Sequence, residues 1–191
     1  MLKNRKKEVF MFKLGIIGTG SISHEFIKAA HSTGDYQLAA VYSRTLASAE
    51  RFVQNYENTA IFTEMLDFLS SDIDVVYIAS PNSLHFNHAK VAILARKHVI
   101  VEKPAVSRPK EWRELVKLAD EHQVYLFEAA RNYHEQAFDT ISDFLKDKTV
   151  LGANFTYAKY SSKMQALLAG EQPNVFSAKF SGGALMDLGV Y

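Results

Sequence analysis

Short apolar runs alternate with amphipathic segments between residues 11 and 130 of the chain. The runs have the β-branched and aromatic content of buried strands, whereas the segments between them repeat their apolar positions with the period of an α-helix. The expected strands are residues 12–17, 37–42, 75–79, 98–101 and 125–129. The expected helices are residues 23–32, 46–55, 63–69, 83–96, 109–122 and 137–146. This alternation predicts an α/β fold built on a doubly wound parallel sheet with right-handed crossovers.

The pattern changes after Thr149. Residues 152–160 have the character of a strand, residues 164–169 that of a short helix, and residues 181–183 that of a turn before a last helix. We therefore expect one domain over residues 11–130 and the start of a second over residues 131–191. The roughly forty residues after Thr149 bury too little surface to form a core of their own, so we expect them to be a fragment of that second domain. The alternative is that they pack on the first domain or on a second chain.

Composition narrows the class of protein. Of the 191 residues, 48% are hydrophobic, which is enough for one well-buried core. The formal net charge of +1 gives no electrostatic reason to bind nucleic acid or an acidic membrane, so a small metabolite is the expected partner. The absence of cysteine excludes disulfides and thiolate metal sites and fits a cytoplasmic location. Residues 1–8 are basic without an apolar stretch behind them, so we expect a frayed arm, with Met11 as the natural start.

A glycine turn follows the first expected strand. Gly18 permits a tight turn, Gly20 lets a phosphate approach the backbone, and the helix that follows offers its free N–H groups. Ser23 occupies the position where a third glycine or an alanine is usual, and its small side chain should be tolerated. The alternative is a turn that only closes a βα unit. The expected pyrophosphate-binding residues are Gly18, Thr19, Gly20, Ser21 and Ile22.

The second expected strand ends in Ser43-Arg44, where an acidic residue would bind the ribose 2′-hydroxyl of NAD. A small hydroxyl followed by an arginine suits a 2′-phosphate instead, because the guanidinium can form forked, charge-assisted hydrogen bonds. The alternative is that Arg44 is an ordinary surface charge. NADP is therefore favoured over NAD as the cofactor.

Polar residues also follow the strands at residues 75–79 and 98–101, at the sheet edge where ligands bind. The first group is Ser80-Pro81-Asn82 with His85, and the second is Glu102-Lys103-Pro104. Asn82 could be a helix N-cap, and Glu102-Lys103 a solvated ion pair. His85 and His88 have the spacing of a metal pair but no third ligand nearby, so no metal is expected.

These motifs resemble, in order and spacing, those of the Gfo/Idh/MocA oxidoreductase family. The resemblance runs from Met11 and includes the late segment Gly182-Gly183-Ala-Leu-Met-Asp187-Leu-Gly-Val-Tyr191. It implies a Rossmann domain followed by an α+β domain with an open sheet, which lines the substrate site and often mediates oligomerisation. It also implies NAD(P)-dependent oxidation or reduction of sugars, inositols or related diols.

The resemblance assigns site residues. It makes Lys103, Asp187 and Tyr191 the catalytic residues. It also places Glu102 and Lys103 beside the cofactor, together with Ser80, Pro81, Asn82 and His85. Many family members have histidine at the position of Tyr191, and a protonated phenol suits carbonyl reduction better than alcohol oxidation. Tyr133 and His134, after the strand at residues 125–129, are candidate substrate contacts.

The sequence thus predicts an oxidoreductase that passes a hydride between nicotinamide and a hydroxyl or carbonyl carbon of a polyol-like substrate. Tyr191 or Lys103 would handle the proton and Asp187 would align the substrate. The full-length form is expected to be a homo-oligomer. The alternatives are a non-catalytic NAD(P)-binding sensor of the same fold and a module for another adenosine ligand. Because family members continue beyond Tyr191, we expect the 191-residue chain to bind cofactor but to be weakly active.

Overall fold

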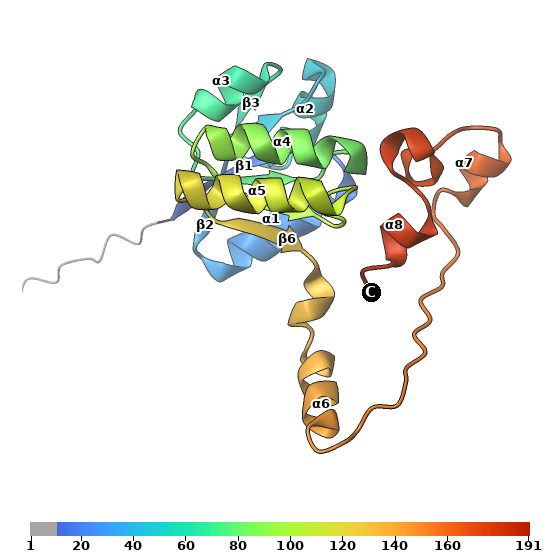
Figure 1. Cartoon of the computed structure of the whole chain (residues 1–191). Helices are drawn as coiled ribbons and strands as arrows, with labels where there is room; N and C mark the ends of the chain where they lie inside the picture. The colour runs from blue at the N-terminus through green and yellow to red at the C-terminus, as the bar shows by residue number, and fades with distance from the viewer. Residues whose placement is uncertain (1–10) are drawn as a thin grey trace, which may run out of the picture.

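The computed structural model describes residues 11–191, and a six-stranded parallel sheet forms the centre of its first part (Figure 1). The arm expected over residues 1–8 lies outside the described residues. The strand order is β3-β2-β1-β4-β5-β6, so the direction of winding reverses between β1 and β4. This order confirms the predicted doubly wound Rossmann fold. The strands are β1 (Phe12–Ile17), β2 (Tyr36–Tyr42), β3 (Ala60–Phe62), β4 (Val75–Ile78), β5 (His98–Glu102) and β6 (Leu126–Ala129).

Helices cover both faces of this sheet. They are α1 (Ser21–Thr33), α2 (Leu46–Val53), α3 (Met65–Ser70), α4 (Asn82–Leu94) and α5 (Pro109–His122). Alternate residues of a strand point to opposite faces, so Val76 and Ile78 of β4 pack with α3, α4 and α5, whereas Val75 and Tyr77 pack with α1 and α2. Burial on both faces explains why the strands read as continuous apolar runs. Trp112 of α5 is partly buried against the first of these clusters.

Over residues 11–146 the expected helices and strands lie close to the observed ones, with one omission. The short strand β3 pairs with β2 but was not among the expected strands. α5 begins and ends where the pattern predicts, because Pro109 opens it and the Glu111 carboxylate accepts from the backbone N–H of Ser107 and Arg108 at 3.2 and 3.1 Å.

The predicted strand at residues 152–160 is wrong. These residues form an exposed connection without regular secondary structure between α6 (Gln136–Leu145) and α7 (Met164–Leu168) (Figure 1). A strand is stable only where a neighbour takes up its hydrogen bonds, and no strand of residues 11–191 lies beside this connection. The remaining elements are η1 (Arg131–His134), η2 (Asn174–Phe176), η3 (Ala178–Phe180) and α8 (Ala184–Leu188).

The last segment returns to the carboxyl edge of the sheet and is tethered there. The Asn82 amide donates to the Ser181 carbonyl oxygen at 3.1 Å, and the hydroxyls of Ser107 and Ser181 are 2.7 Å apart. The Asn132 amide donates to the carbonyl oxygen of Val190 at 2.8 Å. These contacts bring η3 and α8 against the turns that follow β4 and β5.

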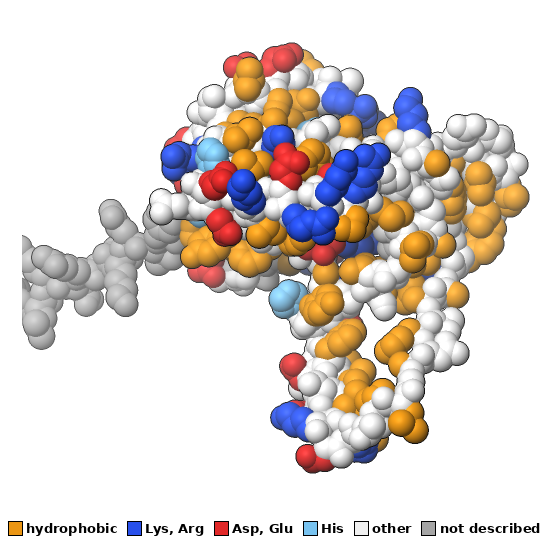
Figure 2. All heavy atoms as spheres, viewed as in Figure 1, with side chains coloured by type: hydrophobic (Ala, Val, Ile, Leu, Met, Phe, Trp, Pro, Cys, Tyr) orange, Lys and Arg blue, Asp and Glu red, His pale blue; other side chains and the backbone are white. Residues whose placement is uncertain are grey.

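Apolar side chains remain exposed on α6 and on the connection that follows it, where Figure 2 shows them gathered. Phe144 is 65% exposed, Leu151 96% and Phe155 87%. Single exposed apolar residues are common, but a group of this size indicates an interaction surface. Among the described helices none has the length and apolar character needed to span a membrane.

Candidate functional site

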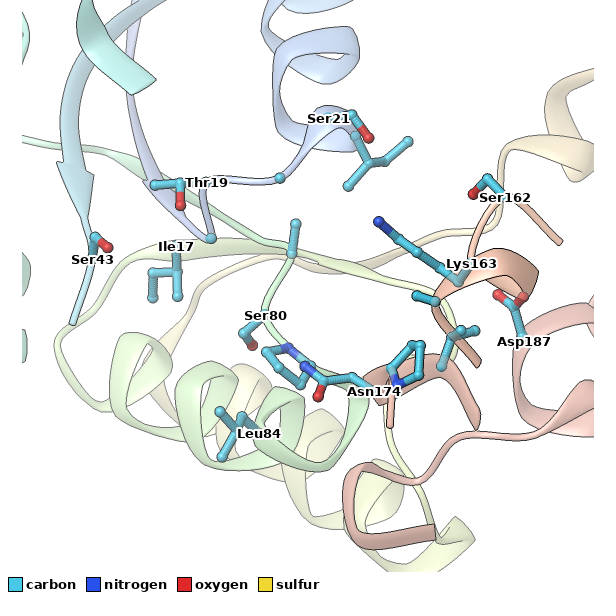
Figure 3. A pocket seen from close by; sticks show the side chains of 18 of the residues that line it. Ile17, Thr19, Ser21, Ser43, Ser80, Leu84, Ser162, Lys163, Asn174 and Asp187 are labelled. Carbon is cyan, nitrogen blue, oxygen red and sulfur yellow. The ribbon is translucent and has the colours of Figure 1, made fainter. Parts of the chain in front are cut away.

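A cavity of about 910 Å³ lies at the carboxyl edge of β1, β2 and β4. Its volume is in the upper part of the range for small-molecule sites, roughly 300 to 1,000 Å³. The turns of the Rossmann domain form one wall, and residues between 159 and 175 form the opposite wall (Figure 3). Nine of the predicted cofactor-binding residues line it: Gly18, Thr19, Gly20, Ser21, Ile22, Ser43, Arg44, Ser80 and Pro81.

The two glycines of the turn differ in what an added side chain would meet. Gly18 has a φ of +109°, and a Cβ there would lie 2.4 Å from the carbonyl oxygen of Ala79. Gly20 has a φ of −86°, and a Cβ there would project into open space. Gly20 is also the N-cap of α1, whose first N–H groups have no side-chain cap. The turn therefore offers a bare backbone and a helix N-terminus to an anion, which fits a pyrophosphate.

The surroundings of Ser23 show why a serine fits where a third glycine or an alanine is usual. It is fully buried, and its hydroxyl donates to the carbonyl oxygen of Gly18 at 2.7 Å. The small hydroxyl side chain is tolerated, as expected, and it also fastens the first turn of α1 to the glycine turn.

The end of β2 contributes Ser43 and Arg44, and His88 of α4 lies near them. The His88 Nδ1 and the Ser80 hydroxyl are 2.9 Å apart, and the His88 ring packs edge-on against Tyr42, with ring centroids 6.5 Å apart. Burial, followed by the nearby His85 and the Arg44 guanidinium, lowers the pKa of His88 to about 4. His88 is therefore neutral at physiological pH.

His88 should make the protein sensitive to acid. Its pKa is about 4 in the folded chain and about 6.5 when unfolded, so below pH 6.5 only the unfolded chain takes up the proton. The stability contributed by the neutral ring is complete near neutral pH and is lost as the pH falls from 6.5 towards 4. We expect a loss of about 2 kcal/mol at around pH 5.

Urea unfolding of the wild type and of His88→Gln at neutral pH and near pH 5 measures this loss. The variant should lose less stability than the wild type over this interval, while His85 affects both proteins in the same direction. Equal losses in the two proteins would show that His88 does not contribute.

His85 lies beneath the cavity wall and does not line the cavity. It is 1% exposed, and its ring nitrogens lie 2.8 Å from the Pro104 carbonyl oxygen and 2.7 Å from the Ser80 carbonyl oxygen. Burial lowers the pKa of His85, against the effect of these carbonyls. His85 thus joins the turn after β4 to the turn after β5. The N-cap alternative for Asn82 is wrong, because Pro81 occupies the N-cap and Asn82 is the first residue of α4.

Glu102 and Lys103 do not form the solvated ion pair considered as an alternative. The Tyr77 hydroxyl, from the buried centre of the sheet, donates to Glu102 Oε1 at 2.6 Å. Tyr77 also stacks on Phe26, and burial together with the Glu102 carboxylate raises the pKa of its phenol. The Tyr77 hydroxyl therefore holds the Glu102 carboxylate in place, and the Lys103 side chain is free to point away from Glu102.

Lys103 points to the C-terminal segment. Its ammonium donates to the backbone oxygen of Asp187 at 2.6 Å and to Asp187 Oδ1 at 2.9 Å. It also lies over the ring of Tyr191, 5.1 Å from the centroid, and Tyr191 stacks on Tyr157. The structure thus brings Lys103, Asp187 and Tyr191 together, and Asp187 also lines the cavity.

Other predicted residues lie away from the cavity. Tyr133 is 73% exposed and stacks on Phe138, and His134 is exposed. In the part of the chain that the structure describes, no group of three acidic, histidine or cysteine side chains could hold a metal ion. The sequence reasoning missed the second wall, which includes Lys159, Ser161, Ser162, Lys163 and residues 171–175. No local motif marks these residues, because only the return of the chain places them there.

The chain is similar in sequence to known oxidoreductases. The chain is 40% identical to the uncharacterized oxidoreductase YgjR of Escherichia coli over 189 residues, which are 95% of this chain and 56% of that protein. It is 37% identical to scyllo-inositol 2-dehydrogenase (NADP(+)) IolU of Bacillus subtilis over 183 residues, with the same two shares. The chain thus spans about half the length of the curated relatives it matches.

A solved structure and a family pattern extend the comparison. The crystal structure of a 3-ketoreductase from Actinomadura kijaniata in complex with NADP and TDP-benzene superposes with a TM-score of 0.67 at 25% identity, covering 72% of this chain and 42% of that one. The sequence pattern of the oxidoreductase family with an NAD-binding Rossmann fold matches residues 12–130. The chain therefore belongs to the Gfo/Idh/MocA oxidoreductase family, and residues 12–130 are its NAD-binding Rossmann fold.

Proposed function

We propose that this protein is an NAD(P)-dependent oxidoreductase that acts on a hydroxyl or carbonyl carbon of a sugar, inositol or diol. One observation carries the proposal: the cavity beside the glycine turn is continuous at Asp187 with a cluster of two ionic groups and a phenol. A domain that only held a nucleotide would not need that cluster. The scyllo-inositol 2-dehydrogenase activity of one relative supports the same class of substrate.

When bound, the nicotinamide supplies the hydride chemistry. In the direction of reduction, the substrate carbonyl oxygen gains a proton as its carbon gains the hydride. The Lys103 ammonium and the Tyr191 phenol are the two donors at hand, and Lys103 is placed between Asp187 and Tyr191. The Asp187 carboxylate, which faces the cavity, would accept a hydrogen bond from a neighbouring substrate hydroxyl and align the substrate. Glu102, held by Tyr77, would keep the Lys103 backbone in place.

The residues at the proposed ribose site favour NADP over NAD. Ser43 and Arg44 line the cavity where an acidic residue would bind an unmodified ribose, and no carboxylate lies on the Rossmann side of the cavity lining. A guanidinium beside a hydroxyl can hold the additional phosphate. The NADP dependence stated in the name of the Bacillus relative supports this choice.

We further propose that residues 131–191 begin a second domain that contributes to the substrate site, and that the protein acts in the cytoplasm as a homo-oligomer. The exposed apolar side chains of α6 and of the connection after it support an interface there. A non-catalytic NAD(P) sensor of the same fold is the alternative. It would bind the cofactor at the same glycine turn but would not turn over a polyol.

Titration of the 191-residue protein with NADPH and NADH, followed by nicotinamide fluorescence, tests the cofactor site. We expect NADPH to bind more tightly than NADH. Arg44→Ala should weaken NADPH binding about tenfold and leave NADH binding nearly unchanged, because only NADPH carries the 2′-phosphate. Arg51→Ala, which removes an exposed arginine of α2 outside the cavity, is the matched control and should change neither affinity.

An equal loss of NADPH and NADH affinity in Arg44→Ala would overturn the assignment of the 2′-phosphate to this residue. Failure of the folded wild type to bind either cofactor would overturn the proposed function itself.

A further inference from the structure

The two walls of the cavity differ in charge. On the Rossmann side, the glycine turn and the start of α1 offer backbone N–H groups, and the one cationic side chain that lines the cavity there is Arg44. The opposite wall adds Lys159 and Lys163, together with the carboxylate of Glu171. If Arg44 holds a ribose phosphate, no cation of the Rossmann wall is left for the pyrophosphate at the glycine turn.

Lys163 is placed to supply the missing cation. It lies directly before α7, and its backbone N–H donates to the Ser161 hydroxyl at 3.1 Å, which fixes the turn. Figure 3 shows its side chain extending into the cavity, with the amine towards the glycine turn and Ser21.

The Lys163 ammonium is also uncommitted. Within residues 11–191 it forms no ion pair, whereas the Asp187 carboxylate on the same wall is paired with Lys103. A lysine that extends into a cavity without a carboxylate partner is suited to a ligand anion, because the ligand then meets a full positive charge that no internal group neutralises.

We infer that Lys163 binds the pyrophosphate of the dinucleotide from the side opposite the glycine turn. This inference rests on the proposed function and adds a cofactor residue from outside the Rossmann domain. The pyrophosphate would then lie between the N–H groups of α1 and one ammonium, so that both walls contribute to its charge-assisted hydrogen bonds.

Two consequences distinguish Lys163 from Arg44. The pyrophosphate is common to NAD and NADP, so Lys163 contributes equally to both cofactors, whereas Arg44 contributes to NADP alone. Lys163 belongs to the C-terminal segment, so a bound cofactor also holds residues 159–175 against the Rossmann domain.

Fluorescence titrations of Lys163→Met and Lys163→Glu with NADPH and NADH test the inference. Lys163→Met keeps the length and apolar stem of the side chain and should weaken both cofactors by the same factor, about threefold to tenfold. Lys163→Glu should weaken both further, because it places a negative charge opposite the phosphates. The loss in Lys163→Met should shrink at high salt, which screens an exposed charge. Lys148→Met, an exposed lysine outside the cavity lining, is the control and should bind as the wild type does.

A second measurement follows the segment itself. NADPH should slow proteolysis of the chain between residues 159 and 175 in the wild type more than in Lys163→Met. Unchanged affinities in both Lys163 variants, with wild-type binding intact, would overturn the role of Lys163 and leave the proposed function standing. A loss confined to NADPH would also overturn it, since it would place Lys163 at the 2′-phosphate. If the wild type binds neither cofactor, the inference fails together with the proposed function.

Discussion

Lys103→Met is expected to lower the rate of hydride transfer about 100-fold while changing cofactor affinity little. The methionine keeps most of the volume of the lysine but removes the ammonium that hydrogen-bonds Asp187 and lies over Tyr191. The proton donor and the alignment of Asp187 would be lost together. Single-turnover mixing of the NADPH complex with a panel of carbonyl forms of sugars and inositols, followed by nicotinamide absorbance, measures the rate even where turnover is slow.

Lys103→Met also removes the hydrogen bonds that hold Asp187 of the C-terminal segment, so a control variant is needed. Asn132→Ala removes the hydrogen bond from Asn132 to the Val190 carbonyl oxygen, a tether of the same segment, and leaves Lys103 in place. The assignment of Lys103 requires a much smaller loss of rate in Asn132→Ala. Comparable losses would mean that Lys103 acts only by holding the segment. A wild type that binds NADPH but reduces none of the panel would favour the sensor alternative.

Gly18→Ala is expected to destabilise the Rossmann domain by about 3 kcal/mol. The alanine would have to adopt the φ of +109°, and its Cβ would lie 2.4 Å from the Ala79 carbonyl oxygen. Both atoms in this clash belong to the backbone, so no side chain can rotate away, and β1 and the turn after β4 must separate. Chemical unfolding at neutral pH gives the loss, and cofactor binding should be lost with it.

Gly20→Ala is the control for this prediction. Its backbone is already in a conformation open to alanine, and the added Cβ meets nothing within 4 Å. Stability should therefore remain near that of the wild type, while cofactor affinity falls because the methyl group projects where the pyrophosphate approaches. Similar stabilities of Gly18→Ala and the wild type would mean that the turn has another conformation in solution.

Local sequence patterns were enough to predict most of the Rossmann domain. The run from Phe12 through Gly20 combines a buried strand, a turn that needs glycine and a helix start within a few residues, so periodicity and turn chemistry predict it. β3 was not predicted because its three residues, Ala60–Phe62, are too few to show the alternation of a strand. Its existence depends on β2 beside it, and that neighbour is not encoded locally.

Elsewhere the structure depends on contacts between residues that are far apart in the sequence, and local patterns could not predict these contacts. Alternation alone predicted a strand at residues 152–160, but no neighbouring strand pairs with it in residues 11–191. The contact between Tyr77 and Glu102 joins adjacent strands and follows from their register, which a single sequence does not reveal. Lys163 was missed for the same reason, since it carries no motif and reaches the cavity only through the return of the chain.

The position of Trp112 makes the two parts of the chain separately observable. It is the single tryptophan of the sequence, and it packs beside the sheet core from α5. Its emission therefore reports loss of the Rossmann core. An unfolding curve followed by tryptophan emission, compared with one followed by backbone circular dichroism, will show whether the C-terminal segment melts before the sheet or together with it.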